Sequence, residues 1–92
     1  MTFVLRYTTG EDVQLYDVIK TGNGNIGVIE KLLAPGSIDA EAFFVFDAGG
    51  VLIQENWDGK PGYLVMEADD IPEWEDTSFI RRGTARDLLP RS

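Results

Sequence analysis

The residues best suited to chemistry lie in one acidic stretch in the last third of the chain. Between positions 67 and 76 the sequence reads EADDIPEWED, which places six carboxylates and one indole in ten residues. Exposed charge of one sign attracts partners of the opposite sign and speeds their association. The stretch therefore predicts either a surface that binds a basic partner or a solvated loop that keeps a small protein soluble. The residues that we predict to bind the partner are Glu67, Asp69, Asp70, Glu73, Trp74, Glu75 and Asp76.

Other chemistry is hard to build from this composition. The chain contains no histidine and no cysteine, so the usual general base, the thiolate nucleophile and the common zinc ligands are absent. The acids lie in polar sequence, without the apolar surroundings that tune a catalytic carboxyl group. Their spacing also differs from the twelve-residue calcium loop, which has a central glycine. We therefore expect a protein that is not an enzyme and that has no catalytic residues, no cofactor and no metal site.

The distribution of charge narrows the class of partner. The chain carries a net charge of −8, and residues 1–80 alone hold fifteen acidic against four basic residues, a net −11. Such a body repels phosphate backbones and anionic lipid heads, so we expect a basic protein partner and neither nucleic acid nor a membrane. Arginines concentrate near the C-terminus, and pairing back onto the acidic stretch is their simplest expected role. These arginines are Arg81, Arg82, Arg86 and Arg91.

The length and hydropathy of the chain predict a single small domain. Ninety-two residues support one hydrophobic core. No apolar stretch approaches the roughly 20 residues that span a bilayer, and no basic region followed by an apolar block opens the sequence. Without cysteine there is no disulfide framework. A cytoplasmic location is the resulting expectation.

The elements that must position the acidic stretch are predicted to be strands. Apolar residues alternate over short runs that end at glycine-rich turns, and Gly22-Asn23-Gly24 is a strong hairpin signal. A second hairpin is expected across the turn-rich residues 56–62, with Trp57 packing on it. Gly27 suggests a bulge or a close approach of two backbones. Apolar residues also alternate at Val13 and Leu15. The runs expected as strands are 3–7, 18–19, 26–33, 51–55, 63–67 and 78–81.

One short helical turn is predicted near residues 37–43. Ser37 is suited to cap it, because a serine side chain accepts a hydrogen bond from the free backbone N–H groups of a first turn. The following run, residues 43–46, either staples this turn to the sheet or forms a short strand. For Trp74 the sequence leaves two roles open, a lid on the core or a contact with the partner.

Five or six short strands with at most one short helix indicate an all-β domain. At this length a small, partly open antiparallel barrel protects the sheet edges, and a two-sheet sandwich is the alternative. The predicted β-barrel domain covers residues 1–83. Residues 84–92 are predicted to be a flexible C-terminal tail, because only Leu88 and Leu89 in it are sizeable apolar residues.

Five segments of turn and core residues form a recognisable pattern along the chain. The segments are residues 12–19 (DVQLYDVI), 24–29 (GNIGVI), 35–37 (PGS), 49–53 (GGVLI) and 77–83 (TSFIRRG). Together they resemble small bacterial SH3-like barrel proteins of the toxin-immunity type. The resemblance covers roughly residues 3–83 and implies an SH3-like barrel that acts as an immunity protein, but it carries over no functional residues. One departure is Tyr16, which stands before Asp17 where a glycine is common.

Two functions from different classes follow. The first is a protein-binding inhibitor, an immunity protein that neutralises a basic cognate toxin by placing its acidic surface against a site that normally receives an anionic substrate. The second is a non-inhibitory SH3-like adaptor or structural interaction module. An adaptor of this kind reads peptides through an exposed aromatic-lined groove. The aromatic residues available for such a groove are Tyr7, Tyr16, Trp57 and Trp74.

Overall fold

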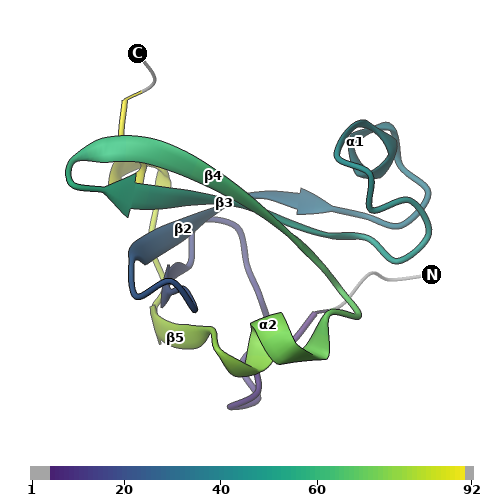
Figure 1. Ribbon diagram of the computed structural model, residues 1–92, viewed down its shortest axis with the longest axis horizontal. Helices are drawn as coiled ribbons and strands as arrows, with labels where there is room; N and C mark the ends of the chain where they lie inside the picture. Colours follow the sequence, from purple (N-terminus) through teal and green to yellow (C-terminus); the bar gives the residue numbers. More distant parts are fainter. Residues whose placement is uncertain (1–4, 91–92) are drawn as a thin grey trace.

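The computed structural model describes residues 5–90, apart from the side chains of Ile71 and Pro72. Its body is one antiparallel sheet of five strands: β1 (Val18–Lys20), β2 (Ile26–Leu33), β3 (Gly50–Trp57), β4 (Lys60–Glu67) and β5 (Ser78–Arg81). The strand order is β4-β3-β2-β1-β5, so the last strand returns to pair with the first (Figure 1). The sheet is strongly bent but open, which confirms the predicted small, partly open all-β fold.

Both predicted hairpins are present. In the first, β1 pairs with β2 across the glycine-rich turn, with Val18 opposite Val28. In the second, β3 and β4 are longer than the sequence predicts, and only Asp58 and Gly59 connect them, both with positive φ. This loop suits the right-handed twist of the two strands. Trp57 packs on this hairpin as expected, since a Cβ atom added to Gly62 would collide with its ring.

The N-terminal part differs from the predicted pattern of strands. Phe3 and Val4 of the predicted strand 3–7 lie outside the described residues, and the rest contributes only an isolated bridge between Arg6 and Asp12. The backbone turns sharply before β1, where Tyr16 adopts φ +70°. This is the position at which the resemblance leads one to expect glycine, and the conformation is one that glycine adopts most easily.

Two hydrophobic clusters hold the sheet together. The smaller one lies under the first helix and joins Leu33, Ala40 and Val45, with Phe43 packed against it. At Gly27 the close neighbour is a side chain and not the predicted second backbone, because a Cβ atom there would lie 2.8 Å from Cγ2 of Ile53 and 3.5 Å from the Gln54 backbone oxygen. The larger cluster lies inside the curved sheet and contains Tyr7, Val13, Ile19, Ile29, Val51, Ile53, Met66 and Trp74.

The helices are more numerous than predicted. The expected one is present as α1 (Ile38–Ala42), and the Ser37 hydroxyl accepts a hydrogen bond from the Ala40 N–H at 3.0 Å. A second, α2 (Ile71–Glu75), lies within the acidic stretch, and a 3₁₀ turn, η1 (Ala85–Asp87), follows β5. No helix in the described residues is long and apolar enough to cross a membrane.

The start of helix α2 is explained by residues at its N-terminus. Asp70 precedes it, and its carboxylate faces the Glu73 N–H at 3.5 Å, while its carbonyl accepts from the Trp74 N–H at 3.2 Å. An aspartate before the first turn and a proline within that turn both favour a helix start. The density of charge in the stretch concealed this signal.

Candidate protein-binding surface

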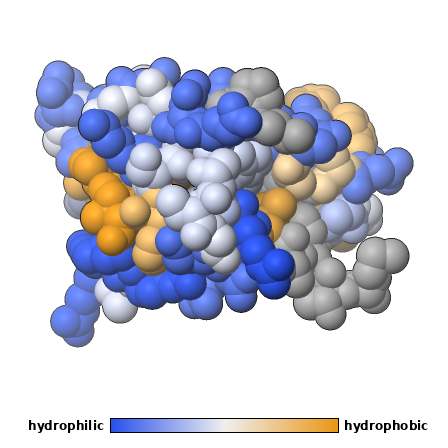
Figure 2. Space-filling model, turned by 90° about the horizontal axis from the view of Figure 1, so that it is seen from below, coloured by the Kyte–Doolittle hydropathy of each residue, from blue (hydrophilic) through white to orange (hydrophobic). Residues whose placement is uncertain are grey.

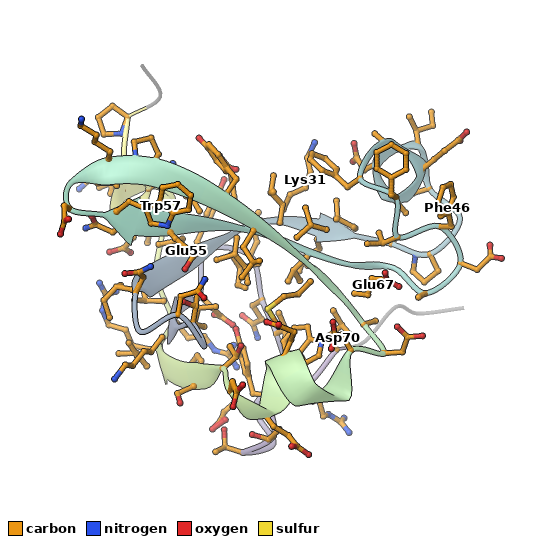
Figure 3. All side chains as sticks on the ribbon, in the orientation of Figure 1. Lys31, Phe46, Glu55, Trp57, Glu67 and Asp70 are labelled. Atoms are coloured by element: carbon orange, nitrogen blue, oxygen red, sulfur yellow. The ribbon has the colours of Figure 1, made fainter. Side chains whose placement is uncertain are left out.

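An acidic ridge runs from the end of β4 along α2. Its six carboxylates are all exposed, and Figure 3 shows two of them, Glu67 and Asp70, at the junction of the strand and the helix. The ridge is anchored in the sheet because Glu67 pairs with Gly50 of β3. All six predicted carboxylates are accessible to solvent. The residues of the acidic ridge are Glu67, Asp69, Asp70, Glu73, Glu75 and Asp76.

Trp74 belongs to the core and not to the exposed surface. Its side chain is only 6% exposed, and its ring centroid lies 6.1 Å from that of Tyr7. The indole N–H donates a hydrogen bond to the Glu67 carbonyl at 2.8 Å, which ties the helix to the end of β4. A side chain held in this way cannot contact a partner, so the predicted partner-binding role of Trp74 is replaced by a supporting one. Among the two roles left open by the sequence, the lid on the core is the one observed.

Within residues 5–90, the charges of the ridge are not neutralised by ion pairs. Among the described residues, no ion pair involves a carboxylate of the ridge. Arg81 pairs with Asp87 at 2.7 Å, and Arg82 pairs with Asp17 at 2.8 Å, so the expected pairing of these two arginines with the acidic stretch is not observed. Arg91 lies outside the described residues. The ridge therefore keeps its attraction for an external cation.

Asp87, and not the acidic ridge, is the ion-pair partner of Arg81. The hydrogen bond from Arg81 and, next, the backbone N–H of Thr84 hold the pKa of the Asp87 carboxyl group below its ordinary value of 3.8. The same contact raises the pKa of Arg81. Two further hydrogen bonds join the backbone of Leu89 to the side chain of Gln54, at 2.6 and 3.0 Å. Residues 84–90 are therefore attached to β3 and β5.

Two buried carboxylates escaped sequence reasoning. Asp17 is fully buried and accepts hydrogen bonds from the Tyr7 hydroxyl at 2.7 Å, the Gln14 N–H at 2.8 Å and Arg82 at 2.8 Å. Burial, and next the hydrogen bond to Asp17, disfavour the ionised form of Tyr7. The pKa of Tyr7 therefore lies well above its ordinary range. This network fastens the N-terminal segment and β5 to the start of β1. The only signal in the sequence was an acid placed directly before an apolar strand.

Glu55 is the second buried carboxylate. It is 1% exposed on β3 and accepts hydrogen bonds from the Thr21 hydroxyl at 2.8 Å and from the side-chain amides of Asn23 and Asn25. A buried acid with three donors from one turn fixes that turn against the sheet. Its role is structural, because these neutral donors satisfy it without leaving an open face.

The aromatic groove of an SH3-like peptide reader is not assembled from the predicted residues. Tyr7 and Trp74 are buried, at 3% and 6% exposure, whereas Trp57 is 52% exposed on the β3–β4 hairpin. Figure 3 shows Trp57 at the opposite end of the sheet from Glu67 and Asp70. The four aromatic residues therefore line no common exposed trough.

Sites for small ligands are equally poorly developed. A hollow of about 50 Å³ lies between β2, β3 and the C-terminal segment, whereas pockets for small molecules usually measure about 300–1,000 Å³. In the described part of the chain, no three acidic side chains converge as a metal site would require. The hollow is lined by Ile26, Val28, Gln54, Asn56, Asp87 and Leu89.

Comparison of the chain with protein-family models, with curated proteins and with solved structures finds no match.

Proposed function

We propose that this chain is a protein-binding inhibitor that engages a basic partner through the acidic ridge. The observation that carries the proposal is a buried tryptophan beneath six exposed carboxylates that form no ion pair with any other residue that the structure describes. Surface charges that are already paired gain little from a partner. Charges that are unpaired and held on a fixed element can steer a basic protein towards one orientation.

The mechanism of inhibition is competition for a positively charged site. A protein that acts on nucleic acid or on another phosphorylated substrate presents cationic groups where the substrate binds. The ridge offers carboxylates over one strand end and one helix, and the bond from Trp74 to Glu67 fixes their spacing. Together with the resemblance to immunity proteins, this arrangement supports a basic toxin as the partner. The cytoplasm, where a producing cell must protect itself, is the location that belongs to this proposal.

The proposal is tested by capture and inhibition. The tagged chain is used as bait in extracts of its own cells at low salt, and captured proteins are identified by mass spectrometry. The variant D69N/D70N/D76N is the matched bait, since it removes three charges of the ridge. We expect a basic protein that the native chain captures and inhibits and that the variant captures at least about tenfold more weakly, a change of roughly 1.4 kcal/mol.

The control removes the same amount of charge from elsewhere. The variant E11Q/D12N/D58N changes three acids outside the ridge and leaves the ridge intact. It should retain most of the binding. Equal losses in the two variants would show that net charge alone is responsible, and capture of an acidic partner would contradict the proposal outright.

A further inference from the structure

Helix α1 ends in a Schellman motif that carries phenylalanine at the position usually occupied by glycine. The Phe44 N–H donates to the Glu41 carbonyl at 3.2 Å, and the Val45 N–H donates to the Ala40 carbonyl at 2.9 Å. These two bonds define the motif, and Phe44 adopts the left-handed conformation it requires, with φ +61°. A side chain with a Cβ atom is disfavoured in this conformation. Phe44 is therefore placed here at a cost to stability.

Phe46, two residues later, is a second phenylalanine with positive φ. Phe46 also has a positive φ, +35°, and its conformation is imposed by bonds from its N–H to Ala40 and from the Gly36 N–H to its carbonyl. Between the two phenylalanines, Val45 is 2% exposed and packs on Leu33. Strained residues persist where the surrounding structure imposes them, and they are concentrated at functional sites.

In the described residues, neither phenylalanine belongs to the two hydrophobic clusters of the core. Phe44 is 75% exposed and Phe46 is 52% exposed, and their centroids lie 6.1 Å apart in an edge-to-face arrangement. Ile38, on the same short helix segment, is 85% exposed. We call the apolar surface formed by Ile38, Phe44 and Phe46 the aromatic end. Figure 2 shows light orange atoms beside hydrophilic atoms at the right-hand side of the molecule.

The aromatic end lies at the same end of the sheet as Glu67, the first residue of the acidic ridge, while Figure 1 shows α1 and α2 on opposite sides of the sheet. The Gly49 carbonyl, three residues after Phe46, accepts a hydrogen bond from the Ala68 N–H at 2.9 Å. Figure 3 shows Phe46 and Glu67 at the same end of the sheet. Glu41 and Asp47 border the aromatic end and take part in no ion pair of the described residues. A third acid of this region, Asp39 of α1, forms an ion pair with Lys31, with 3.3 Å between Oδ1 and Nζ.

We propose that the aromatic end binds an apolar side chain presented by a lysine- or arginine-rich segment of the partner. The inference rests on the proposed function, which requires a basic partner. It adds a second requirement, that the partner presents an apolar residue among its basic ones. Charge complementarity selects this occupant. A second copy of the chain would bring the same acids and the same net charge of −8, and an anionic membrane would be repelled in the same way.

The test uses two synthetic peptides of equal length and charge, one built from lysine and leucine and the other from lysine and alanine. Binding is followed by NMR chemical shifts of the native chain and of F44G/F46G. We expect the native chain to prefer the leucine peptide, with shifts in residues 38–47. In F44G/F46G the dissociation constant for this peptide should rise about tenfold or more, whereas that for the alanine peptide should not change.

Stability separates a binding role from a structural one. Glycine suits both positive φ values, so the melting temperature of F44G/F46G should stay within about 3 °C of the native value or rise. F44N serves as a second variant, because asparagine tolerates the same conformation. The matched control is W57A, which removes another aromatic ring with 52% exposure and should leave the affinity for both peptides unchanged.

Three results would overturn the inference. The first is equal affinity of the native chain for the two peptides. The second is a clear fall in melting temperature in both F44G/F46G and F44N, which would make the rings structural. The third is a dimer that grows with concentration and disappears in F44G/F46G, which would make a second copy the occupant. The variant D69N/D70N/D76N should bind both peptides more weakly than the native chain, by the same factor. If it has no effect while F44G/F46G does, the proposed function fails and the aromatic end still binds.

Discussion

Helices α1 and α2 have the same length of five residues, but they attach to the sheet in opposite ways. Helix α2 places its one large aromatic residue, Trp74, in the core and leaves its carboxylates in solvent. Helix α1 places only the small Ala40 in the core, and the turn that follows it leaves two phenylalanines in solvent. The first helix therefore offers an apolar surface, and the second offers charge.

This difference shows that residue type alone does not identify a contact residue. A tryptophan among acids looks like a binding residue in the sequence, yet its ring supports the surface from beneath. Phenylalanines beside a capped helical turn look like core, yet they are exposed. The path of the backbone decides which side of each ring faces solvent, and at Phe44 and Phe46 that path requires positive φ.

The largest expected effect comes from removing the anchor of α2. Trp74→Ala deletes a ring that is 6% exposed and the hydrogen bond to Glu67, so we expect a loss of about 3–5 kcal/mol in the free energy of unfolding. Urea titration measures this loss. Trp57→Ala, at 52% exposure, should cost less than about 1 kcal/mol. Equal costs for the two tryptophans would remove the distinction between anchor and surface.

The next effect concerns Tyr7, the buried neighbour of Trp74. Its pKa in the folded protein is raised above the ordinary value of 10.0, first by burial and then by the hydrogen bond to Asp17. The folded state therefore holds this proton more tightly than the unfolded state, and the corresponding stability is present below pH 10 and is lost as the pH rises further.

Tyr7→Phe separates this effect from general alkaline unfolding. At neutral pH the variant should lose about 2 kcal/mol, because a buried hydrogen bond to a carboxylate is removed. Between pH 10 and pH 12 its stability should fall less steeply than that of the native chain. Parallel curves, measured by urea unfolding at each pH, would mean that Tyr7 ionises as easily in the folded state as in the unfolded one.

Truncation after Gly83 tests how much the ion pair of Arg81 and the hydrogen bonds of Gln54 contribute to stability. It removes Asp87 and the backbone of Leu89, which leaves Arg81 without its carboxylate and Gln54 without its two hydrogen bonds. We expect a loss of about 1–2 kcal/mol in the free energy of unfolding. A melting temperature unchanged from the native chain would support the flexible tail that the sequence predicts. The contacts of residues 84–90 favour the opposite result.

The smallest expected effect is that of Phe44→Gly on stability. The substitution relieves a disfavoured conformation but gives the unfolded chain more freedom, so the two contributions offset each other to within about 1 kcal/mol. Ala40→Gly is the comparison within the same helix. Since Ala40 is fully buried, its loss should cost more than about 1 kcal/mol. A larger cost for Phe44→Gly than for Ala40→Gly would contradict the assignment of Phe44 to the surface.

Much of the fold follows from local patterns in the sequence. Alternation and glycine-rich turns predict β2, β3, β4 and β5, and the serine before α1 predicts its start, because these signals act between near neighbours in the chain. The burial of Asp17 depends instead on a residue far away in the chain, since Arg82 reaches Asp17 across 65 positions. No local pattern carries that information.

The acidic ridge was predictable as a set of residues but not as a shape. The number and spacing of its acids come from the sequence, whereas the positions of Arg81 and Arg82 in the fold direct these two arginines to Asp87 and Asp17 and away from the ridge. The helix start at Asp70 was visible and was outweighed by the density of charge. The aromatic end had no signal, because φ at Phe44 is set by the end of α1 and by the packing of Val45.

The most direct test of the central claim is the salt dependence of association between this chain and its captured partner. Stopped-flow measurements from low to physiological salt would compare the native chain with D69N/D70N/D76N. If the ridge steers a basic protein, the association rate constant of the native chain falls steeply with salt, and the variant associates more slowly with a flatter dependence. Identical slopes for the two proteins would show that the acidic ridge takes no part in binding.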